Sequence, residues 1–576
     1  MKIDITAKTL PKNAAEAKIT KIHKQIGDEV QSGDSLLELE ANKASMPIIS
    51  QARGTITALY VEAGQKVKAD DPLCTIEGEE VLDASPKQSS TDDKPSLGYF
   101  AGMMKPQKKT VASDLCIIGA GPGGYVAAIK AAQLGCRVVL IEKEHVGGTC
   151  LNWGCIPTKC MVRSAEVYTT LQSAEDYGCF ADYLRLDMRR VLQRKDEVVT
   201  QLRQGIEHLL SENGVTVLSG TAELVDRNTV LSKQSSSETT VTAKKLIIAT
   251  GSRITNPPIP GAQLKQVINS DIALQLEALP VKMVVVGGGV VGMEFAFIFS
   301  SFGVNVSVVE YADQILSNCD PDICAEIYQI AIEKGIKIYR HAMVEAILPA
   351  QDDQCVVVFK QDDEVKYLAT DMVLMSIGRE PVIAGLGFEK LGIELNDNKK
   401  GIKVNEHMET SVPGIYAIGD VTNRMLLAHV ASHQGIVAVR NIMGESCDMD
   451  YTAVPSAIFT EPEIGIVGLN EETARKKGYD ITVGKFPVGA NGKALAMGES
   501  RGFIKIIAEE KSGTILGAAI IGPHASDLIA DLTLAVNRKL TLRDIYETIY
   551  AHPTTAEIIH EAALGAEGRS LHFVGS

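Results

Sequence analysis

The chain has 576 residues, which is too long for one hydrophobic core, so several domains are expected. With 45% hydrophobic and 22% charged residues, the composition is typical of a globular protein. The formal net charge of -15 argues against nucleic acid as a partner, because an acidic chain repels phosphates. The first ten residues lack the apolar centre of a secretory signal, and eleven scattered cysteines do not resemble a secreted disulfide framework, so we expect a cytoplasmic protein.

Residues 1–80 are expected to form short strands built from an internal duplication. The phrase GDEVQSGDSLLELE begins at Gly27, and the similar phrase GQKVKADDPLCTIE begins at Gly64. Each has a glycine turn, a valine, an acidic turn and an apolar strand that ends in glutamate. Such a repeat predicts a small flattened barrel made of two matching sheets.

Lys43 stands between the two repeats, in the segment ELEANKASMPIIS, where the register predicts the tip of a hairpin. This arrangement resembles the lipoyl domains, in which the lysine of such a turn carries a covalent lipoyl group. Lipoyl domains usually have Asp where this chain has Asn42, and a biotin carrier would usually have Met on both sides of the lysine. We therefore expect lipoylation of Lys43; the alternative is an ordinary solvated lysine.

Residues 81–110 are rich in Ser, Pro, Asp and Lys and have little periodicity. This composition is typical of a flexible linker. The alternative is an ordered strap against the next domain, anchored by the apolar side chains of Tyr99, Phe100, Met103 and Met104.

From Val111 onward the pattern changes to strand, glycine turn and helix, which is typical of βαβ units in a parallel sheet. The first unit has Gly119, Gly121 and Gly124 between its strand and its helix. Glycines at this spacing permit a tight turn and let a pyrophosphate approach the helix N-terminus closely. Glu142 ends the next strand, where a carboxylate can bind ribose hydroxyls.

A second unit of the same kind has Gly287, Gly289 and Gly292, followed by Glu310 at the end of its next strand. One glycine fingerprint is a weak signal, but two copies with strand, helix and acid in place predict two dinucleotide sites. One site is expected to hold resident FAD and the other an exchangeable NAD, because Glu310 would repel the 2′-phosphate of NADP. The glycines and the charge in this apolar stretch also argue against a membrane span.

Cys150 and Cys155 lie five residues apart in the segment GGTCLNWGCIPTK, soon after Glu142. A pair with this spacing is usually two buried thiols. Its closeness to the first dinucleotide site favours redox exchange instead, since thiolates near a helix N-terminus have a lowered pKa. Most of the remaining cysteines are expected to be small buried apolar residues, and no metal site is predicted.

The same segment resembles the active-site motif of the pyridine nucleotide–disulfide oxidoreductases, and the resemblance covers residues 111–576. Its departures are Trp153, where a small aliphatic residue is common, and Thr158, where Ser is common. Four further segments resemble the lipoamide dehydrogenase branch of that family, namely IGRE from Ile377, YAIGD from Tyr416, FTEPEIGIVG from Phe459 and HPTTAE from His552.

This resemblance implies a homodimer with FAD in the first site and NAD in the second. It also implies further cofactor contacts, which are Lys159 beside the flavin with Glu294 as its partner, Asp420, Ala222 and Ala428 at the FAD, and Gly378 at the NAD.

The expected fold is multidomain, with a small all-β lipoyl-type barrel, an α/β part with two Rossmann-like dinucleotide-binding domains, and an α+β dimerisation domain at the C-terminus. Alternating segments such as GFIKIIAEE and GTILGAAIIG predict the antiparallel sheet of this last domain. The expected boundaries are 1–80 for the lipoyl domain, 81–110 for the linker, 111–257 for the FAD domain, 258–381 for the NAD domain, 382–450 for a central domain that completes the FAD site, and 451–576 for the interface domain.

His552 precedes Pro553, which keeps it outside the helix that follows. Thr554 and Glu557 fit a capping box for the run EIIHEAAL, so a helix cap and a catalytic role for Glu557 remain equally open on the residues alone. The resemblance implies that the pair of His552 and Glu557 reaches the disulfide of the other subunit. A carboxylate at one ring nitrogen orients an imidazole and makes it more basic, so that it can deprotonate a thiol.

The resemblance implies an enzyme that oxidises dihydrolipoyl groups and reduces NAD, serving a 2-oxo acid dehydrogenase or glycine cleavage complex. One alternative is a lipoyl carrier whose flavin half is vestigial, and the complete set of two cysteines, histidine and glutamate argues against it. Another is a related NAD(P)-dependent disulfide reductase. A mercuric reductase would need a cysteine pair near the C-terminus, where the last cysteine here is Cys447, and a glutathione reductase would favour NADP.

Overall fold

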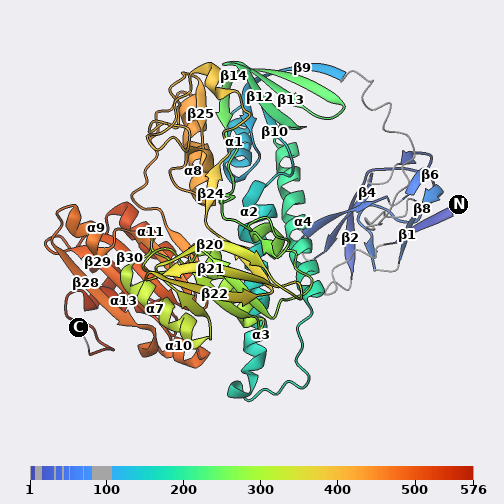
Figure 1. Cartoon of the computed structure of the whole chain (residues 1–576). Coiled ribbons are helices and arrows are strands. Elements are labelled where there is room, and N and C mark those ends of the chain that lie inside the picture. Colours follow the sequence, from blue (N-terminus) through green and yellow to red (C-terminus); the bar gives the residue numbers. More distant parts are fainter. Residues whose placement is uncertain are drawn as a thin grey trace. The chain divides into compact units, whose positions relative to one another are not determined.

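The computed structural model divides into two compact units, Met1–Gly102 and Met103–Ser576, which are considered separately (Figure 1). The described residues are 2–6, 16–30, 34–41, 44–50, 52–68, 71–80 and 107–574. Of the expected linker, only residues 107–110 are described. The side chains named as anchors of an ordered strap, from Tyr99 to Met104, lie outside the described residues.

The N-terminal unit consists of two four-stranded antiparallel sheets. One has the order β1-β8-β6-β3, with bounds Lys2–Thr6, Pro72–Glu80, Ala52–Leu59 and Glu29–Val30. The other has the order β5-β4-β2-β7, with bounds Ala44–Ile49, Ser35–Ala41, Ala17–Ile22 and Lys66–Val67. Both sheets contribute to one apolar core, which includes the buried side chains of Ile19, Leu39, Ile56 and Ile76. The barrel of two matching sheets is confirmed.

The two repeats begin with equivalent glycine turns. Gly27 has a φ of +98° and Gly64 a φ of +94°, a region of backbone conformation that favours glycine. The amide of Gly27 donates to the carbonyl of Ile56 at 2.9 Å, and the amide of Gly64 donates to that of Ile19 at 2.7 Å. The first repeat is thus bound to β6 and the second to β2, in equivalent ways.

The predicted attachment site falls between β4 and β5. These strands are antiparallel neighbours, and Ala41 at the end of β4 lies opposite Ala44 at the start of β5. Asn42 and Lys43, the two residues that join them, lie outside the described residues.

The first α/β domain is built on a seven-stranded sheet of mixed direction. Its parallel strands are β9 (Gln107–Ile118), β10 (Val138–Glu142), β11 (Thr216–Ser219), β14 (Ser237–Ile248) and β25 (Ile415–Ala417). β12 (Thr221–Asp226) and β13 (Thr229–Lys233) extend it as an antiparallel hairpin. β25 follows the second domain in the chain yet pairs with β14, so this later part of the chain returns to the first sheet.

β9 begins at Gln107, ahead of the position where the sequence first resembles a strand. Its first residues, QKKT, are polar and pair with the equally polar start of β14, from Ser237 to Thr240. An exposed strand end carries no apolar alternation, which is why the sequence pattern marks the strand only from Val111.

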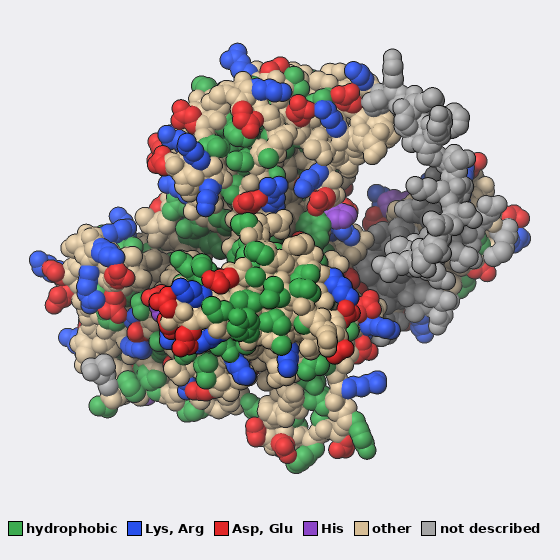
Figure 2. Space-filling view, viewed as in Figure 1, with side chains coloured by type: hydrophobic (Ala, Val, Ile, Leu, Met, Phe, Trp, Pro, Cys, Tyr) green, Lys and Arg blue, Asp and Glu red, His purple; other side chains and the backbone are tan. Residues whose placement is uncertain are grey.

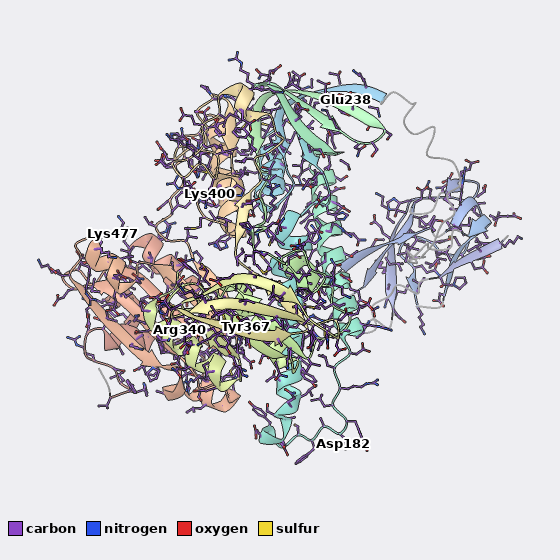
Figure 3. All side chains as sticks on the ribbon, in the orientation of Figure 1. Asp182, Glu238, Arg340, Tyr367, Lys400 and Lys477 are labelled. Carbon is purple, nitrogen blue, oxygen red and sulfur yellow. The ribbon has the colours of Figure 1, made fainter. Side chains whose placement is uncertain are left out.

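The helices of this domain include a closely packed pair. α1 (Pro122–Gln133) lies against α8 (Ala428–Ile442), and a Cβ on Gly435 would lie 2.7 Å from the carbonyl oxygen of Gly123. α2 (Gly148–Asn152) leads into the long helices α3 (Cys155–Gln172) and α4 (Met188–Glu212). Figure 3 labels Asp182 in the connection between these two helices.

The second α/β domain has a five-stranded parallel sheet. Its order is β16-β23-β17-β18-β19, with bounds Val267–Ile268, Met372–Met375, Lys282–Val286, Asn305–Val309 and Lys337–Tyr339. Its helices are α5 (Ser270–Ala273), α6 (Val290–Ser301) and α7 (Pro321–Glu333). A three-stranded antiparallel sheet accompanies it, made of β20 (Ala342–Pro349), β21 (Cys355–Gln361) and β22 (Glu364–Thr370).

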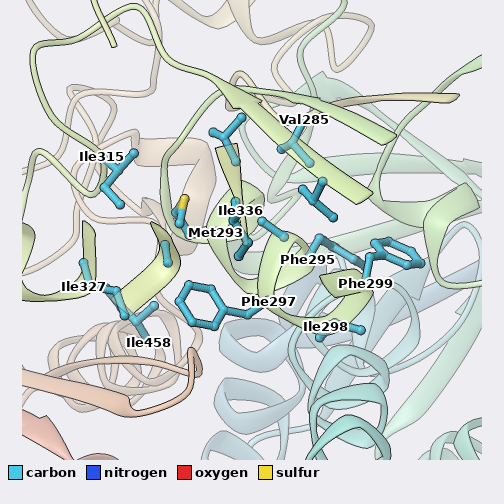
Figure 4. Close-up of a cluster of buried hydrophobic side chains, with 14 of the residues drawn as sticks. Val285, Met293, Phe295, Phe297, Ile298, Phe299, Ile315, Ile327, Ile336 and Ile458 are labelled. Atoms are coloured by element: carbon cyan, nitrogen blue, oxygen red, sulfur yellow. The ribbon is translucent and has the colours of Figure 1, made fainter. Parts of the chain in front are cut away.

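The apolar stretch 283–303 forms the strand β17, the glycine turn and the helix α6, as predicted. Phe295 and Phe299 of α6 are almost completely buried, and their rings stack at 5.9 Å (Figure 4). Among the described residues, no helix is long and apolar enough to cross a membrane. On the face shown in Figure 2, Lys and Arg side chains lie among Asp and Glu rather than in one basic patch.

The C-terminal domain has a five-stranded antiparallel sheet, as the alternating segments predict. Its order is β26-β27-β30-β29-β28, with bounds Ser456–Ile458, Glu463–Gly468, Ile515–Gly522, Phe503–Glu509 and Ile481–Pro487. Its helices are α9 (Glu471–Lys476), α10 (Gly492–Met497), α11 (Ala525–Arg538), α12 (Leu542–Tyr546) and α13 (Glu557–Gly565). The buried ammonium of Lys505 on β29 lies 2.7 Å from Asp320 at the start of α7, which ties this domain to the second one.

Candidate active site

The first glycine turn joins β9 to α1. Gly119 has a φ of +102°, and a Cβ on Gly124 would lie 1.8 Å from the carbonyl oxygen of Gly119. Both positions therefore require glycine. A Cβ on Gly121, the N-cap of α1, would meet nothing within 4 Å, so this residue faces open space at the positive end of the helix. The turn has the shape of a pyrophosphate cradle and fits a dinucleotide.

Glu142, at the end of β10, holds this turn in place. Its carboxylate accepts hydrogen bonds from the amides of Ala120 at 2.7 Å and Glu144 at 2.9 Å. Its backbone carbonyl accepts one from the amide of Gly220 at 2.8 Å, which brings the start of β12 beside it. The side chain of Ala222 on β12 is buried in the core, so a cofactor contact of this residue would come from its backbone.

The second glycine turn, between β17 and α6, repeats this geometry. Gly287 has a φ of +103°, and a Cβ on Gly292 would lie 1.9 Å from its carbonyl oxygen. A Cβ on Gly289 would meet nothing within 4 Å. In both turns, the first glycine thus has a positive φ, the second faces open space, and the third lies against a carbonyl oxygen.

Glu310 and Gly378 line a cavity of about 530 Å³ beside the second turn. The carboxylate of Glu310 accepts hydrogen bonds from the amides of Gly288 and, at 2.7 Å, Ala312. Gly378, with a φ of +112°, lies between β23 and β24 (Arg379–Pro381). The volume is in the range of small-molecule sites, and the charge of Glu310 disfavours a 2′-phosphate, so the residues fit NAD.

Cys150 and Cys155 lie at the junction of α2 and α3. Cys155 is the first residue of α3, where the helix dipole stabilises a thiolate, and it is exposed, while Cys150 is half-buried. A Cβ on Gly148, two residues before Cys150, would lie 2.7 Å from the Cα of Gly121. This contact places the pair of thiols beside the first dinucleotide cradle. Together with the exposure of Cys155, it argues against the alternative of two inert buried thiols.

The two thiols differ in acidity. A hydrogen bond from the Cys150 thiol and the positive charge of Lys159 lower the pKa of Cys155 to about 7, although desolvation of the sulfur and the charge of Glu294 act in the opposite direction. The same hydrogen bond and burial raise the pKa of Cys150. When the pair is reduced, the negative charge therefore rests on Cys155, which makes Cys155 the better leaving group and Cys150 the sulfur that remains a thiol.

Lys159 and Glu294 form the ion pair that the resemblance implies. The ammonium of Lys159 lies 2.9 Å from both carboxylate oxygens of Glu294, which is 4% exposed. Glu294 also accepts a hydrogen bond from the amide of Phe459 at 3.0 Å, and the ammonium lies 4.3 Å from the centre of the Phe459 ring. The pair joins α3, α6 and the C-terminal domain around the thiols.

Asp420 follows β25 and lies in a hydrogen-bonded chain that the sequence reasoning missed. The hydroxyl of Ser252 donates to Asp420 at 2.5 Å, and Arg379 donates to that hydroxyl at 2.8 Å. Arg379 also donates to the hydroxyl of Thr149, next to Cys150, at 3.3 Å. Burial raises the pKa of Asp420, although its bond with Ser252 and the charge of Arg379 act in the opposite direction. Arg379 stands within the IGRE segment, whereas nothing local marks Ser252.

Ala428 is the first residue of α8, so its amide lies at the positive end of a fifteen-residue helix. The buried side chain of Gln434 on the same helix accepts from the amide of Gly419 at 2.6 Å and donates to the hydroxyl of Tyr451 at 2.8 Å. Gln434 therefore fixes the residue that precedes Asp420. No sequence signal pointed to it.

His552 and Glu557 form what is termed here the acid–base pair. Nδ1 of His552 lies 2.9 Å from Oε1 of Glu557. The imidazole is 79% exposed and the carboxylate 29% exposed, so the pair is anchored by its carboxylate and presents its ring to the surroundings. Burial would raise the pKa of Glu557, but the amide of Thr554 and the ring of His552 lower it below its usual value.

The predicted capping box is only half present. The amide of Thr554 donates to Oε2 of Glu557 at 2.9 Å, as such a box requires. The hydroxyl of Thr554, however, donates to the carbonyl of Ala551 at 2.7 Å, and the N-cap of α13 is Ala556, with no side-chain cap. The prediction of a complete box is wrong because the carbonyl of Ala551 takes the hydroxyl and the N-cap of the helix lies two residues after Thr554. Glu557 thus serves both the turn and the histidine.

Three protein-family models match the chain. The model described as pyridine nucleotide-disulphide oxidoreductase matches residues 113–435, and the dimerisation domain of the same family matches residues 454–563. The model described as biotin-requiring enzyme, which covers biotin and lipoyl domains, matches residues 5–76.

Curated relatives match over nearly their whole length. A dihydrolipoyl dehydrogenase of Chlamydia pneumoniae is 44% identical over 462 residues, which are 80% of this chain and 98% of the relative. A dihydrolipoyl dehydrogenase of Geobacillus stearothermophilus is 40% identical over 467 residues, or 81% of this chain and 98% of the relative.

Solved structures show the same fold. The flavoprotein disulfide reductase RclA of Escherichia coli, solved as a Cu(II) complex, has a TM-score of 0.71 at 30% identity and covers 78% of this chain and 99% of its own. LpdA of Mycobacterium tuberculosis has a TM-score of 0.73 at 27% identity, with the same coverage. The resemblance inferred from the sequence and the expected fold class are confirmed. The chain therefore belongs to the pyridine nucleotide-disulphide oxidoreductase family, as a relative of the dihydrolipoyl dehydrogenases with an additional N-terminal domain of the biotin/lipoyl type.

Proposed function

We propose that the chain is an NAD-dependent dihydrolipoyl dehydrogenase whose catalytic residues are Cys150, Cys155 and the acid–base pair. The observation that carries this proposal is the pair of thiols of unequal acidity beside the first glycine turn. Relatives of that name match over 98% of their length, which supports an active flavin half rather than a vestigial one. FAD in the first cradle would accept two electrons from the cysteine sulfurs, and NAD in the second would accept them from FAD.

The proposed reaction begins with proton transfer. His552 of the partner subunit takes a proton from one thiol of the substrate, and the thiolate attacks the sulfur of Cys150. A mixed disulfide forms, the Cys150–Cys155 bond breaks, and Cys155 leaves as a thiolate. This direction of cleavage agrees with the lowered pKa of Cys155, because the more acidic thiol leaves faster.

The second thiol of the substrate then attacks the substrate sulfur that forms the mixed disulfide with Cys150. The lipoyl ring closes, and the released Cys150 takes up a proton, which its raised pKa favours. The substrate has lost two electrons and two protons, and the two cysteines hold the electron pair, for which bound FAD would be the acceptor. Lys159 and Glu294 form an ion pair next to the thiols, and this pair stays in place while the charge of the two sulfurs changes.

A steady-state assay with free dihydrolipoamide tests this proposal. We expect turnover with NAD and much weaker turnover with NADP, because Glu310 stands where a 2′-phosphate would need a positive charge. The same assay with glutathione disulfide and NADPH tests the alternative that the chain is a different disulfide reductase. Equal activity with both nucleotides, or turnover of glutathione alone, would contradict the assignment.

We also propose that Lys43 carries a covalent lipoyl group and acts as a substrate arm of the same chain. Tethering would raise the local concentration of the substrate above that of a free domain. The cellular role that fits best is reoxidation of lipoyl groups of a 2-oxo acid dehydrogenase or glycine cleavage complex, by a homodimer in the cytoplasm.

Intact mass measures this modification directly. Protein from a host supplied with lipoate is expected to show one lipoyl increment, and Lys43→Ala is expected to lose it. Replacement of Lys66, an exposed lysine of the same domain, should leave the increment unchanged. Asn42→Asp restores the usual residue before the lysine and should give at least equal modification. Unmodified wild-type protein from such a host would remove the arm from the proposal without affecting the flavin half.

A further inference from the structure

Helix α13 carries two carboxylates on one side. Glu557 and Glu561 are four residues apart, so their side chains are neighbours on the helix surface. Glu557 holds His552, as described above. Glu561 holds a second histidine, His572, whose Nδ1 lies 2.8 Å from Oε1 of Glu561. Two histidine–carboxylate pairs therefore lie side by side, and the proposed reaction uses only one of them.

The second pair closes the C-terminal segment onto the helix. Oε2 of Glu561 accepts hydrogen bonds from the hydroxyl of Ser570 at 2.9 Å and from the amides of Leu571 and His572, both at 3.1 Å. Glu561 is 4% exposed, and a buried carboxylate is stable only when such donors surround it. The ring of Phe573 meets that of Phe486 at 6.2 Å, which fixes the end of the segment on β28.

The two pairs also interact through their charges. The hydrogen bond with Glu561 raises the pKa of His572, and the charge of Glu557 raises it further. In the other direction, the charge of His572 adds to the contacts that lower the pKa of Glu557 against its burial. The charge of His572 thus acts on Glu557 as well as on its direct partner Glu561.

Other titratable groups face this cluster. Nδ1 of His560, on the same helix, lies 3.8 Å from Glu561, while its Nε2 lies 3.1 Å from the carbonyl of Tyr546. The ring of Tyr550 lies 6.0 Å from that of His560. On β28, which packs against α13, the ammonium of Lys485 is held 3.2 Å from Asp322.

We propose that Glu561 and His572 are positioning residues for the acid–base pair. Glu561 anchors the C-terminal segment, and the anchored segment holds the charge of His572 next to Glu557. The carboxylate that orients His552 therefore also interacts with the charge of His572. This inference rests on the proposed catalytic role of the acid–base pair.

Two substitutions at His572 separate charge from packing, because both remove the imidazole and only one of them keeps a charge. H572Q keeps a donor to Glu561 but removes the charge, whereas H572K keeps a charge. Loss of a positive charge beside the acid–base pair favours its protonated form. We therefore expect the acid limb of the pH profile of kcat/KM in H572Q to move to higher pH by roughly half a unit. H572K should keep the wild-type limb.

Exchange of the histidine C2 proton, followed by mass spectrometry, gives the pKa of His572 in the holoenzyme without any turnover. We expect this pKa to fall in E561Q, which removes the direct partner of His572. It should also fall, but by less, in E557Q, because Glu557 acts on His572 through its charge alone. H407Q, which removes the histidine of a separate ion pair with Asp448, is the matched control and should leave His572 unchanged.

An unchanged pKa of His572 in E557Q would overturn the proposal, because the two pairs would then be independent. An unchanged acid limb in H572Q would overturn it as well. Neither outcome touches the proposed function, which instead fails if H552Q keeps normal turnover.

Discussion

Replacing Cys155 by Ser is expected to abolish dihydrolipoamide-dependent reduction of NAD while the protein keeps its flavin. A serine hydroxyl neither forms a disulfide nor leaves as an anion near neutral pH, so no electron pair reaches the flavin from the substrate. The first glycine turn and Glu142 do not depend on this sulfur, so FAD should remain bound. Steady-state assay together with the visible flavin spectrum measures both properties.

The matched control is Cys179→Ser, which removes another exposed cysteine of the same domain. It should keep turnover and flavin content. Full activity in the Cys155 variant would refute the assignment of the redox pair, and loss of flavin in both variants would show a folding defect common to the domain.

Replacing His552 by Gln is expected to lower kcat/KM for dihydrolipoamide by about 10²–10⁴-fold, the usual contribution of a positioned general base. Glutamine fills a similar space but cannot accept the thiol proton. Glu557→Gln should cost less, because the imidazole remains and loses only the charge that orients it.

The pH dependence distinguishes a base from a packing residue. Wild-type activity should rise with pH as the acid–base pair loses its proton, and H552Q should lose this limb while retaining whatever activity comes from substrate that is already ionised. A histidine needed only for packing would lower activity equally at all pH values, with the limb preserved. H407Q, in a different part of the chain, should behave as wild type.

The ion pair of Lys159 and Glu294 connects three parts of the chain next to the thiol site. Glu294 is almost fully buried and is satisfied by the ammonium and by the amide of Phe459. Removing one partner of such a pair leaves an uncompensated charge, whose cost of about 3–5 kcal/mol is far larger than that of an exposed pair. Three parts of the chain thus stay in register around Cys150 and Cys155.

The sequence predicted those features whose signal is local. The glycines of both turns and the acids Glu142 and Glu310 stand at fixed spacings because a tight turn, a close helix and a strand end impose them. Within the N-terminal unit, the repeated glycine turns likewise predicted the barrel.

Contacts between distant segments could not be derived from spacing. Lys159 and Glu294 are paired across domains, and only the family resemblance implied it. The chain of Asp420, Ser252 and Arg379 unites three segments, none of which alone carries a signal for the others. The capping box at Thr554 failed for a related reason, since a competing carbonyl of Ala551 is visible only in the folded turn.

The most direct test of the account is differential alkylation of the cysteines before and after anaerobic reduction with one equivalent of dihydrolipoamide. We expect two thiols to become reactive, and peptide mass analysis to place them at positions 150 and 155. The rate at Cys155 should rise through an apparent pKa of about 7, while Cys150 reacts slowly until much higher pH. Reduction that leaves both of these cysteines unlabelled, or that exposes a different pair, would contradict the account.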